Sequence, residues 1–308
     1  MKVHHDLRRG EDDRPLVLAI GFFDGVHRGH REIVRALLRL RRPGFRAAIL
    51  TFSNHPATHL RPDKVPPLIT TLEERVDLLA ATGIDELYLV PFDAGIAALE
   101  APAFLGDIVA AGLRVRGLVV GENFRFGAGR QGDATLAREL LSRRNIEVVA
   151  VPPLLDGAER ISSTRIRAAI LRGDVATADR LLGEPFALRG TVEIGAGRGH
   201  DLGFPTANLG VAAHKTLPAD GVYTALARYD GRDYKALVSI GNNPTFSGAV
   251  RTIEAWLLDF RRTIYGEELV LREFRFVREQ RRFGSAEELL TQMHDDATHV
   301  AFPTFSVT

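Results

Sequence analysis

Apolar and polar positions alternate in two different ways along the chain. In the first half, short apolar runs are separated by segments in which apolar residues recur at helical spacing. Arg31–Leu40 is typical of these segments, because its apolar side chains form one stripe. Apolar runs joined by such helices predict βαβ units and a parallel sheet that is covered on both faces. The predicted strands are Leu16–Ile20, Ala47–Phe52, Leu87–Val90, Leu118–Val120 and Ile146–Val151.

Three more helices are predicted before the pattern changes. Thr71–Ala81 opens with Thr71 and Glu74 at the spacing of a capping box. Two short helices, Ser163–Arg172 and Val175–Leu182, follow the last predicted strand.

After Gly183 the chain consists of strand-like stretches separated by Gly, Pro and Asp-Gly. This spacing predicts a small antiparallel β-barrel. Asp230-Gly231 lies between two of the stretches and is a strong signal for a hairpin turn. A final amphipathic helix is predicted for Ser285–Met293. The predicted strands are Phe186–Ile194, Gly221–Tyr229, Tyr234–Ile240, Thr252–Asp259 and Leu269–Val277.

These patterns together predict an α/β protein of two domains. The 308 residues exceed what a single hydrophobic core normally serves. We place the boundary near Gly183, where the pattern changes. The N-terminal domain, residues 1–183, is then a Rossmann-like parallel-sheet domain. The C-terminal domain, residues 184–308, is a small antiparallel β-barrel with a terminal helix.

The composition excludes several classes of protein. The absence of cysteine excludes disulfides, thiolate zinc sites and cysteine nucleophiles. The net charge of +1 lacks the positive excess that is typical of nucleic-acid-binding domains. No apolar run reaches the ~18 residues of a membrane span, and Met1–Arg14 is charged rather than signal-like. We therefore expect a cytoplasmic protein that binds neither nucleic acid nor membrane.

The segment Gly21–His30 (GFFDGVHRGH) is the first candidate site. It lies between the first predicted strand and the first helix, where open α/β sheets bind ligands and helix N-termini favour anions. Its glycines let the backbone approach a ligand, and His27 and His30 can donate to one phosphate. Such fixed donors stabilise the charge on a phosphoryl group under attack. The candidate loop contacts are Gly21, Phe23, Asp24 and Gly25.

Other interpretations of this segment are open. The two histidines can be ordinary surface or core residues, and the glycines can form a plain turn. Zinc binding is a further alternative, although without cysteine it requires His55 and a carboxylate to converge on the pair. The order of strand, Gly-rich loop, His-x-Gly-His and helix favours the phosphate site.

Two later segments carry residues suited to the same ligand. In Arg160–Arg167, three hydroxyl residues precede two arginines at a predicted helix start. This arrangement suits a leaving pyrophosphate, and the alternative is ordinary N-capping. Gly121–Gly127 (GENFRFG) ends a predicted strand, where recognition of a base or a ring is expected.

The predicted barrel holds a second candidate site. Four glycines within residues 195–203 give a loop that is flexible enough to cover a nucleotide, although barrels also use glycine at their corners. Thr206 and Asn208 alternate, so within a strand they face the same side, and their oxygens suit Mg²⁺. Glu254 lies in an otherwise apolar stretch and is a candidate general base; the alternative is a carboxylate paired with Arg.

These motifs resemble a known family. His-x-Gly-His at residues 27–30, with Ser-Ser-Thr-x-x-Arg at residues 162–167, resembles the nucleotidyltransferase superfamily. The strings GFFDGVHRGH, Thr51-Phe52 with His55-Pro56, and GENFRFG resemble the FMN adenylyltransferase module of bacterial bifunctional riboflavin kinase/FAD synthetases. This resemblance implies that the residues handling ATP phosphates and adenine are His27, His30, Asn123, Ser163, Thr164 and Arg167.

The barrel motifs resemble the riboflavin kinase module of the same family, in its usual order. They are Gly203–Asn208 (GFPTAN), Gly221–Tyr223, Ile240–Phe246, the Glu254 strand and Tyr265-Gly266. The resemblance implies that Thr206 and Asn208 hold Mg²⁺ and phosphate, and that Glu254 is the catalytic carboxylate. It also makes Gly199 and Gly203 candidate nucleotide contacts. His200 departs from the family pattern, which has Arg there, so Arg198 would be the remaining fixed charge.

The resemblance implies a bifunctional enzyme of FAD biosynthesis. One activity would phosphorylate riboflavin with MgATP to give FMN. The other would transfer AMP from a second ATP to FMN, giving FAD and pyrophosphate. Mg²⁺ is the implied cofactor, and the partners are small molecules: ATP, riboflavin and FMN. The alternatives are a nucleotidyltransferase for another phosphorylated substrate and a non-catalytic flavin-binding regulator. The sequence leaves formation of a homo-oligomer open.

Overall fold

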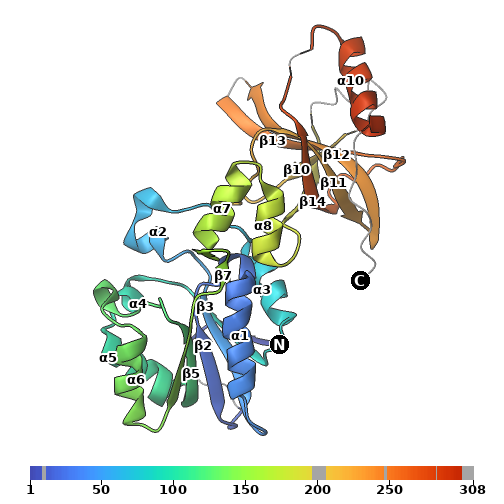
Figure 1. Cartoon of the computed structure of the whole chain (residues 1–308). Coiled ribbons are helices and arrows are strands. Elements are labelled where there is room, and N and C mark those ends of the chain that lie inside the picture. Colours follow the sequence, from blue (N-terminus) through green and yellow to red (C-terminus); the bar gives the residue numbers. More distant parts are fainter. Residues whose placement is uncertain (9–11, 196–205, 246–247, 282, 300–308) are drawn as a thin grey trace. The chain divides into compact units, whose positions relative to one another are not determined.

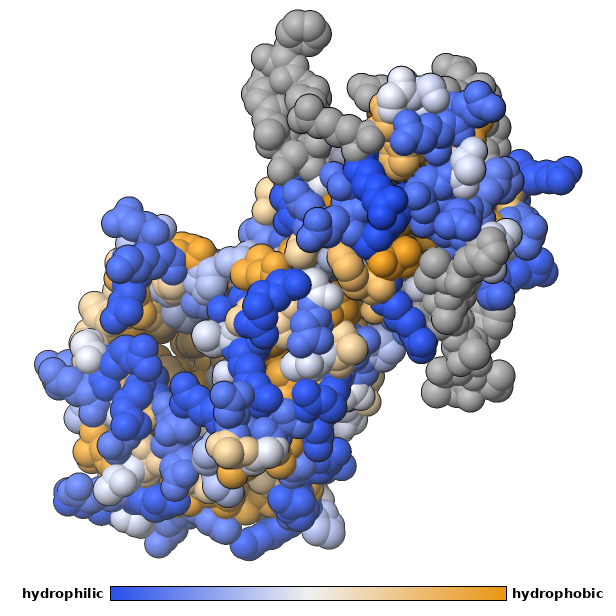
Figure 2. Space-filling view, turned by 45° about the horizontal axis from the view of Figure 1, so that its top comes forward, coloured by the Kyte–Doolittle hydropathy of each residue, from blue (hydrophilic) through white to orange (hydrophobic). Residues whose placement is uncertain are grey.

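The computed structural model describes residues 1–8, 12–195, 206–245, 248–281 and 283–299 (Figure 1). The chain divides into two compact units, Met1–Ser163 and Thr164–Thr308. Among the described residues, no helix combines the length and the apolar content that a bilayer span requires. On the face shown in Figure 2, hydrophilic side chains predominate and the apolar ones form separate patches.

The first unit is built on a six-stranded sheet in which every pairing is parallel, as the alternating pattern predicted. Its strands lie in the order β1-β4-β3-β2-β5-β6, so the order reverses between β2 and β5. The strands are β1 (Lys2–His4), β2 (Leu16–Ile20), β3 (Arg46–Phe52), β4 (Glu86–Val90), β5 (Val115–Gly121) and β6 (Glu147–Val151).

Both faces of this sheet are buried because successive strand residues join different cores. Leu16, Leu18 and Ile20 belong to one apolar cluster, and Val17 and Ala19 belong to the other. Helices α1 (Arg28–Leu40) and α3 (Leu72–Ala80) contribute to the second cluster. The π-helix η3 (Phe104–Gly112) and α6 (Ala134–Ser142) contribute to the first.

Short elements connect these strands and helices. A capping box at Thr71 and Glu74 begins α3, as predicted. The connecting elements are η1 (Asp24–Val26), α2 (Ala57–Leu60), η2 (Pro62–Lys64), α4 (Ala94–Ala98), α5 (Ala101–Ala103), η4 (Ala128–Arg130), β7 (Leu155–Asp156) and β8 (Glu159–Arg160).

The second unit is a closed antiparallel barrel, which confirms the predicted architecture. The strands close in the order β10-β13-β12-β11-β14-β9. Asp230 and Gly231 both have positive φ, 49° and 74°, and turn β11 into β12 as the Asp-Gly signal predicted. The strands are β9 (Ala187–Glu193), β10 (Thr206–Gly210), β11 (Gly221–Tyr229), β12 (Arg232–Thr245), β13 (Gly248–Leu257) and β14 (Glu268–Arg278).

Among the described residues, three helices flank the barrel strands in the sequence. The helix α7 (Ser163–Leu171) begins at the last residue of the first unit, and α8 (Val175–Leu182) follows it. The compact units therefore divide after the first residue of α7, whereas the change of pattern near Gly183 marks the junction of α8 with β9. The terminal helix α10 (Ala286–His299) is longer than the predicted Ser285–Met293.

Candidate nucleotide sites

The sheet order places two predicted segments side by side at one edge. β2 pairs with β3 on one side and with β5 on the other, and all run parallel. The His-x-Gly-His loop follows β2, and the Glu122–Phe126 segment follows β5. Both therefore lie at the carboxyl ends of adjacent strands, where the strand order reverses and open α/β sheets bind their ligands.

His27 and His30 form a stacked pair at the start of α1. Their ring centroids lie 3.6 Å apart and their planes differ by 13°. His27 is the N-cap of α1, and its Nδ1 accepts the backbone N–H of His30 at 3.2 Å. Because Nδ1 accepts this bond, the proton of the neutral His27 ring sits on Nε2, which is left as a donor.

Both rings are neutral near pH 7. Burial lowers the pKa of His27 to about 4. Burial also lowers the pKa of His30 well below its usual range, and repulsion from a protonated His27 and from Arg75 adds to this effect. The pair therefore offers hydrogen bonds to a phosphate and no full positive charge.

The loop before the pair has an unusual backbone. Phe23, Gly25 and Val26 have φ values of 58°, 80° and 39°, and the Phe23 side chain is completely buried. A Cβ atom at Gly21 would come within 2.9 Å of the Phe23 ring, so a residue without one is required there. Strained backbone of this kind persists only where its surroundings fix it.

Asp24 and Gly25 use their polar groups to hold this loop. The Oδ1 atom of Asp24 accepts the N–H groups of Ile69 and Thr70 at 2.9 and 3.2 Å. The N–H of Gly25 donates to Thr70 Oγ1 at 3.1 Å. These contacts give both residues a structural role, and their predicted contact with a nucleotide stays a prediction, as it does for Gly21 and Phe23.

The Ser-Ser-Thr segment reaches the same loop from the end of the first unit. The hydroxyl of Ser163 donates to the backbone oxygen of Asp24 at 3.0 Å. Thr164 and Arg167 follow in the first turns of α7. Asn123 is exposed in the turn after β5. The structure thus brings Ser163 to the His27–His30 loop and places Asn123 after the neighbouring strand.

His55 does not form a zinc site with the pair. Its Nδ1 accepts the backbone N–H of Ala57 at 2.9 Å, and its ring meets the edge of Phe22 at 4.7 Å. Within the part of the chain that the structure describes, no three His, Asp or Glu side chains gather as metal ligands would.

Sequence reasoning missed Arg75 on α3. Its side chain is 2% exposed and donates to the backbone oxygens of Phe22 at 3.0 Å and of Phe52 at 2.7 Å. Its guanidinium also lies 4.4 Å from the centre of the Phe22 ring. No sequence signal marks this residue, because an arginine in a helix is normally assigned to solvent.

In the barrel, two of the predicted side chains, Asn208 and Glu254, lie in one row across three strands. Asn208 on β10 lies directly opposite Glu254 on β13, and Glu254 lies opposite Ser239 on β12. Thr206 lies opposite Trp256 in the same way. The neighbours of these residues along the strands, such as Ala207, Ile253 and Ala255, are buried. Thr206, Asn208 and Glu254 therefore lie together on the other face of the sheet.

The predicted Gly-rich loop is only partly within the described residues. Gly199, Gly203, Arg198 and His200 lie outside them. At Gly195, an added Cβ atom would collide with the end of the Asn208 side chain, so a larger residue there would displace the Asn208 amide.

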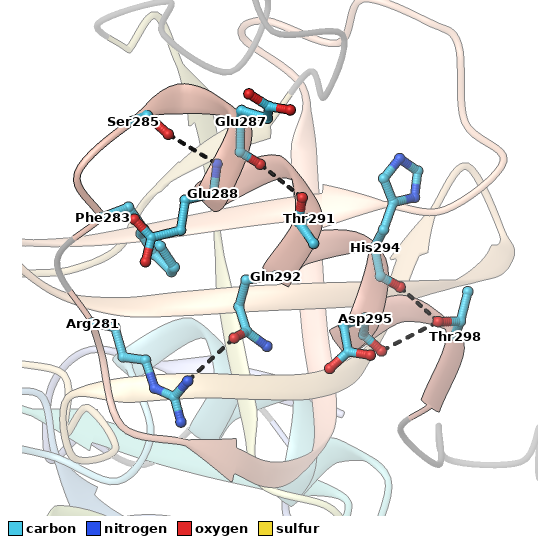
Figure 3. A pocket seen from close by; sticks show the side chains of 10 residues that line it. All are labelled: Arg281, Phe283, Ser285, Glu287, Glu288, Thr291, Gln292, His294, Asp295 and Thr298. Carbon is cyan, nitrogen blue, oxygen red and sulfur yellow. Dashed lines mark hydrogen bonds between the residues drawn. The ribbon is translucent and has the colours of Figure 1, made fainter.

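A cavity of about 740 Å³ lies beside α10 (Figure 3). The Arg281 guanidinium donates to Gln292 at 3.2 Å across it. Its lining contains none of the predicted site residues. The lining residues are Arg281, Phe283, Ser285, Glu287, Glu288, Thr291, Gln292, His294, Asp295 and Thr298.

Comparison with known proteins places both units in one family. The FAD synthetase family model matches residues 9–165, and the riboflavin kinase family model matches residues 182–301. The bifunctional riboflavin kinase/FMN adenylyltransferase of Listeria monocytogenes is 35% identical over 298 residues, which is 96% of this chain and 94% of that protein. The Escherichia coli protein of the same name is 36% identical over 282 residues, 91% of this chain and 90% of that one.

A solved structure has the same fold over nearly the whole chain. The crystal structure described as Macrolide-efflux Protein from Streptococcus pneumoniae matches with a TM-score of 0.87 and 32% identity, over 96% of this chain and 98% of that one. The expected resemblance is thus confirmed. The chain belongs to the family of bifunctional riboflavin kinase/FMN adenylyltransferases, with a FAD synthetase domain followed by a riboflavin kinase domain.

Proposed function

We propose that this chain makes FAD from riboflavin in two ATP-dependent steps. The second unit phosphorylates riboflavin to FMN, and the first transfers AMP from a second ATP to FMN. The observation that carries the proposal is the stacked, neutral His27–His30 pair at the switch point of the sheet, with Ser163 bonded to the same loop. These are the donors that a nucleotide phosphate requires at this place.

In the first unit, the chemistry requires positioning and hydrogen bonds. A phosphate oxygen of FMN attacks the α-phosphorus of ATP, the bond to the bridging oxygen breaks, and its electron pair leaves with pyrophosphate. No proton is transferred, so neutral imidazoles suffice as donors to the phosphoryl oxygens. Ser163, Thr164 and the N-terminus of α7 would hold the leaving pyrophosphate with Arg167, and Asn123 would contact the adenine.

In the second unit, Glu254 is the proposed general base. The 5′-hydroxyl of riboflavin attacks the γ-phosphorus of ATP, Glu254 takes its proton, and ADP leaves. Thr206 and Asn208 offer a hydroxyl and an amide oxygen on the face that carries Glu254, a donor set that fits Mg²⁺. When bound, Mg²⁺ would neutralise charge on the phosphates. Gly199 and Gly203 are proposed to cover that nucleotide.

The proposal also covers the partners of the protein, its cellular location, its oligomeric state and its domain boundary. The partners are small molecules and not nucleic acid, consistent with a net charge of +1. The protein works in the cytoplasm, and a homo-oligomer is compatible with the proposal. We propose that the two activities divide near Gly183; a riboflavin kinase model that begins at residue 182 supports this boundary, whereas the compact units divide after Ser163.

The direct test supplies the purified chain with MgATP and either riboflavin or FMN. Riboflavin should yield FMN and then FAD, and supplied FMN should yield FAD with one pyrophosphate per turnover. Binding of flavin without either product would favour the non-catalytic regulator. AMP transfer to another phosphorylated compound and not to FMN would favour the other nucleotidyltransferase.

A further inference from the structure

Helix α3 is anchored to the His27–His30 loop at two points. The backbone N–H groups of Ile69 and Thr70, just before the helix, donate to the buried Asp24 carboxylate. One turn into the helix, Arg75 reaches the backbone oxygens of Phe22 and Phe52. The helix therefore holds the loop both through its entry segment and through one long side chain.

The two carbonyls that Arg75 contacts lie at the carboxyl ends of adjacent strands. Phe52 is the last residue of β3, and Phe22 follows β2, whose last residue is Ile20. The hydroxyl of Thr51 also donates to the Phe22 oxygen at 3.0 Å. Carbonyl oxygens carry partial negative charge, so uncovered strand ends would repel a triphosphate placed beyond them.

The Arg75 guanidinium is a buried cation that no described carboxylate pairs with directly. Its Nε is buried and lacks a hydrogen-bond partner among the described residues. Burial lowers the pKa of Arg75 to about 10, and the charge of Asp24 acts in the opposite direction. A buried cation that no carboxylate contacts directly is costly, and a bound polyanion would offset part of that cost.

We propose that Arg75 is a positioning residue for adenylyl transfer, whose guanidinium holds the Phe22 and Phe52 carbonyls and supplies a fixed positive charge near the His27–His30 pair. This inference rests on the proposed function of the first unit. Arg75 supplies the full positive charge that the two neutral imidazoles lack.

The test compares R75Q and R75K with a matched control, R46K. Arg46 is 1% exposed and donates to the backbone oxygens of Asp12 and Arg14 at 2.9 and 3.0 Å; unlike Arg75, it also forms a buried ion pair with Glu86. Arg46 is the first residue of β3 and Phe52 is the last, so Arg46 lies at the other end of this strand from Phe52. Riboflavin phosphorylation by the second unit is the internal control for intact protein.

R75Q should lower kcat for FAD synthesis by about 10²-fold and raise the KM for ATP by about 10-fold. Both kcat and the KM for ATP of R75K should lie between those of R75Q and wild type, because lysine keeps the positive charge but has a single ammonium group for two carbonyls. R46K should leave the KM for ATP unchanged. If Arg75 only stabilised the fold, part of the R75Q protein would be inactive. The apparent kcat would then fall in proportion to the fraction of active protein, while the KM for ATP would stay unchanged, and that result would overturn the proposal. Loss of the first unit's thermal transition in both Arg75 variants would overturn it as well.

Calorimetric titration with ATP alone separates this inference from the proposed function. One of two ATP-binding events should weaken about 10-fold in R75Q, and the other should be unchanged. If wild-type protein makes no FAD from FMN but R75Q still weakens one event, the proposed function fails and only the contribution of Arg75 to ATP binding stands. If wild type makes FAD and R75Q binds ATP and turns over as wild type does, the role of Arg75 fails alone.

Discussion

His27 accepts the backbone N–H of His30 through Nδ1, and the two rings stack 3.6 Å apart. One imidazole therefore caps helix α1 and presents Nε2–H as a donor. The His27 side chain therefore has two roles: it caps helix α1 and it offers a hydrogen-bond donor to a phosphate. Replacing His27 with a residue that caps equally well should separate these two roles.

His27→Asn should keep the helix cap and remove the imidazole, because Asn is a preferred N-cap. We expect FAD synthesis to fall by about 10²–10³-fold, with the first unit still folded and riboflavin phosphorylation retained. Product chromatography and circular dichroism check this. An N-cap role alone would leave FAD synthesis near the wild-type rate.

The buried imidazole also makes stability depend on pH. The pKa of His27 is lowered to about 4 in the folded state, so between its unfolded value near 6.5 and pH 4 the unfolded chain binds more protons. The stability from this group is fully present above pH 6.5 and is lost as the pH falls towards 4, at roughly 1 kcal/mol per pH unit. The free energy of unfolding of the first unit, measured with urea, should fall less steeply between pH 6.5 and 5 in His27→Asn than in the wild type. Equal slopes in both proteins would contradict this.

The terminal helix should depend on one ion pair. Arg278 on β14 holds Asp296 on α10 through a fork, with N–O distances from 2.7 to 3.2 Å, and both side chains are mostly buried. Asp296→Ala leaves the guanidinium without its counter-ion and should destabilise the barrel by about 3–5 kcal/mol. The neighbouring exposed Asp295→Ala should change stability by about 0.5 kcal/mol or less. Denaturant titration of both variants checks this prediction. Equal losses of stability in the two variants would show that the Arg278–Asp296 ion pair does not hold α10 to the barrel.

The Mg²⁺ assignment predicts a specific defect at Thr206. Thr206→Val keeps the shape and strand propensity of the side chain but removes the hydroxyl oxygen. FMN formation should then need about 10-fold more Mg²⁺, while FAD formation from supplied FMN is unaltered. Thr191→Val, on the exposed face of the neighbouring strand β9, is the matched control. An unchanged Mg²⁺ requirement in Thr206→Val would remove Thr206 from the metal site.

Periodicity predicted the sheet, the barrel and the Asp-Gly hairpin, because these follow from local spacing. It did not predict β1, which has three residues and pairs with β4 through contacts far along the chain. It also did not predict η3, whose apolar residues are nearly continuous. Burial of Arg75 depends on carbonyls from two other elements, and the role of Asp24 depends on N–H groups of residues 69–70. Neither leaves a trace in local sequence.

The central claim is that two separate sites on one chain perform the two steps. Its most direct test is the product pattern of His30→Ala and Glu254→Ala, measured by chromatography with riboflavin or FMN supplied. The account predicts that His30→Ala accumulates FMN and makes no FAD. It predicts that Glu254→Ala leaves riboflavin unchanged yet converts supplied FMN to FAD. Parallel loss of both products in both variants would contradict it.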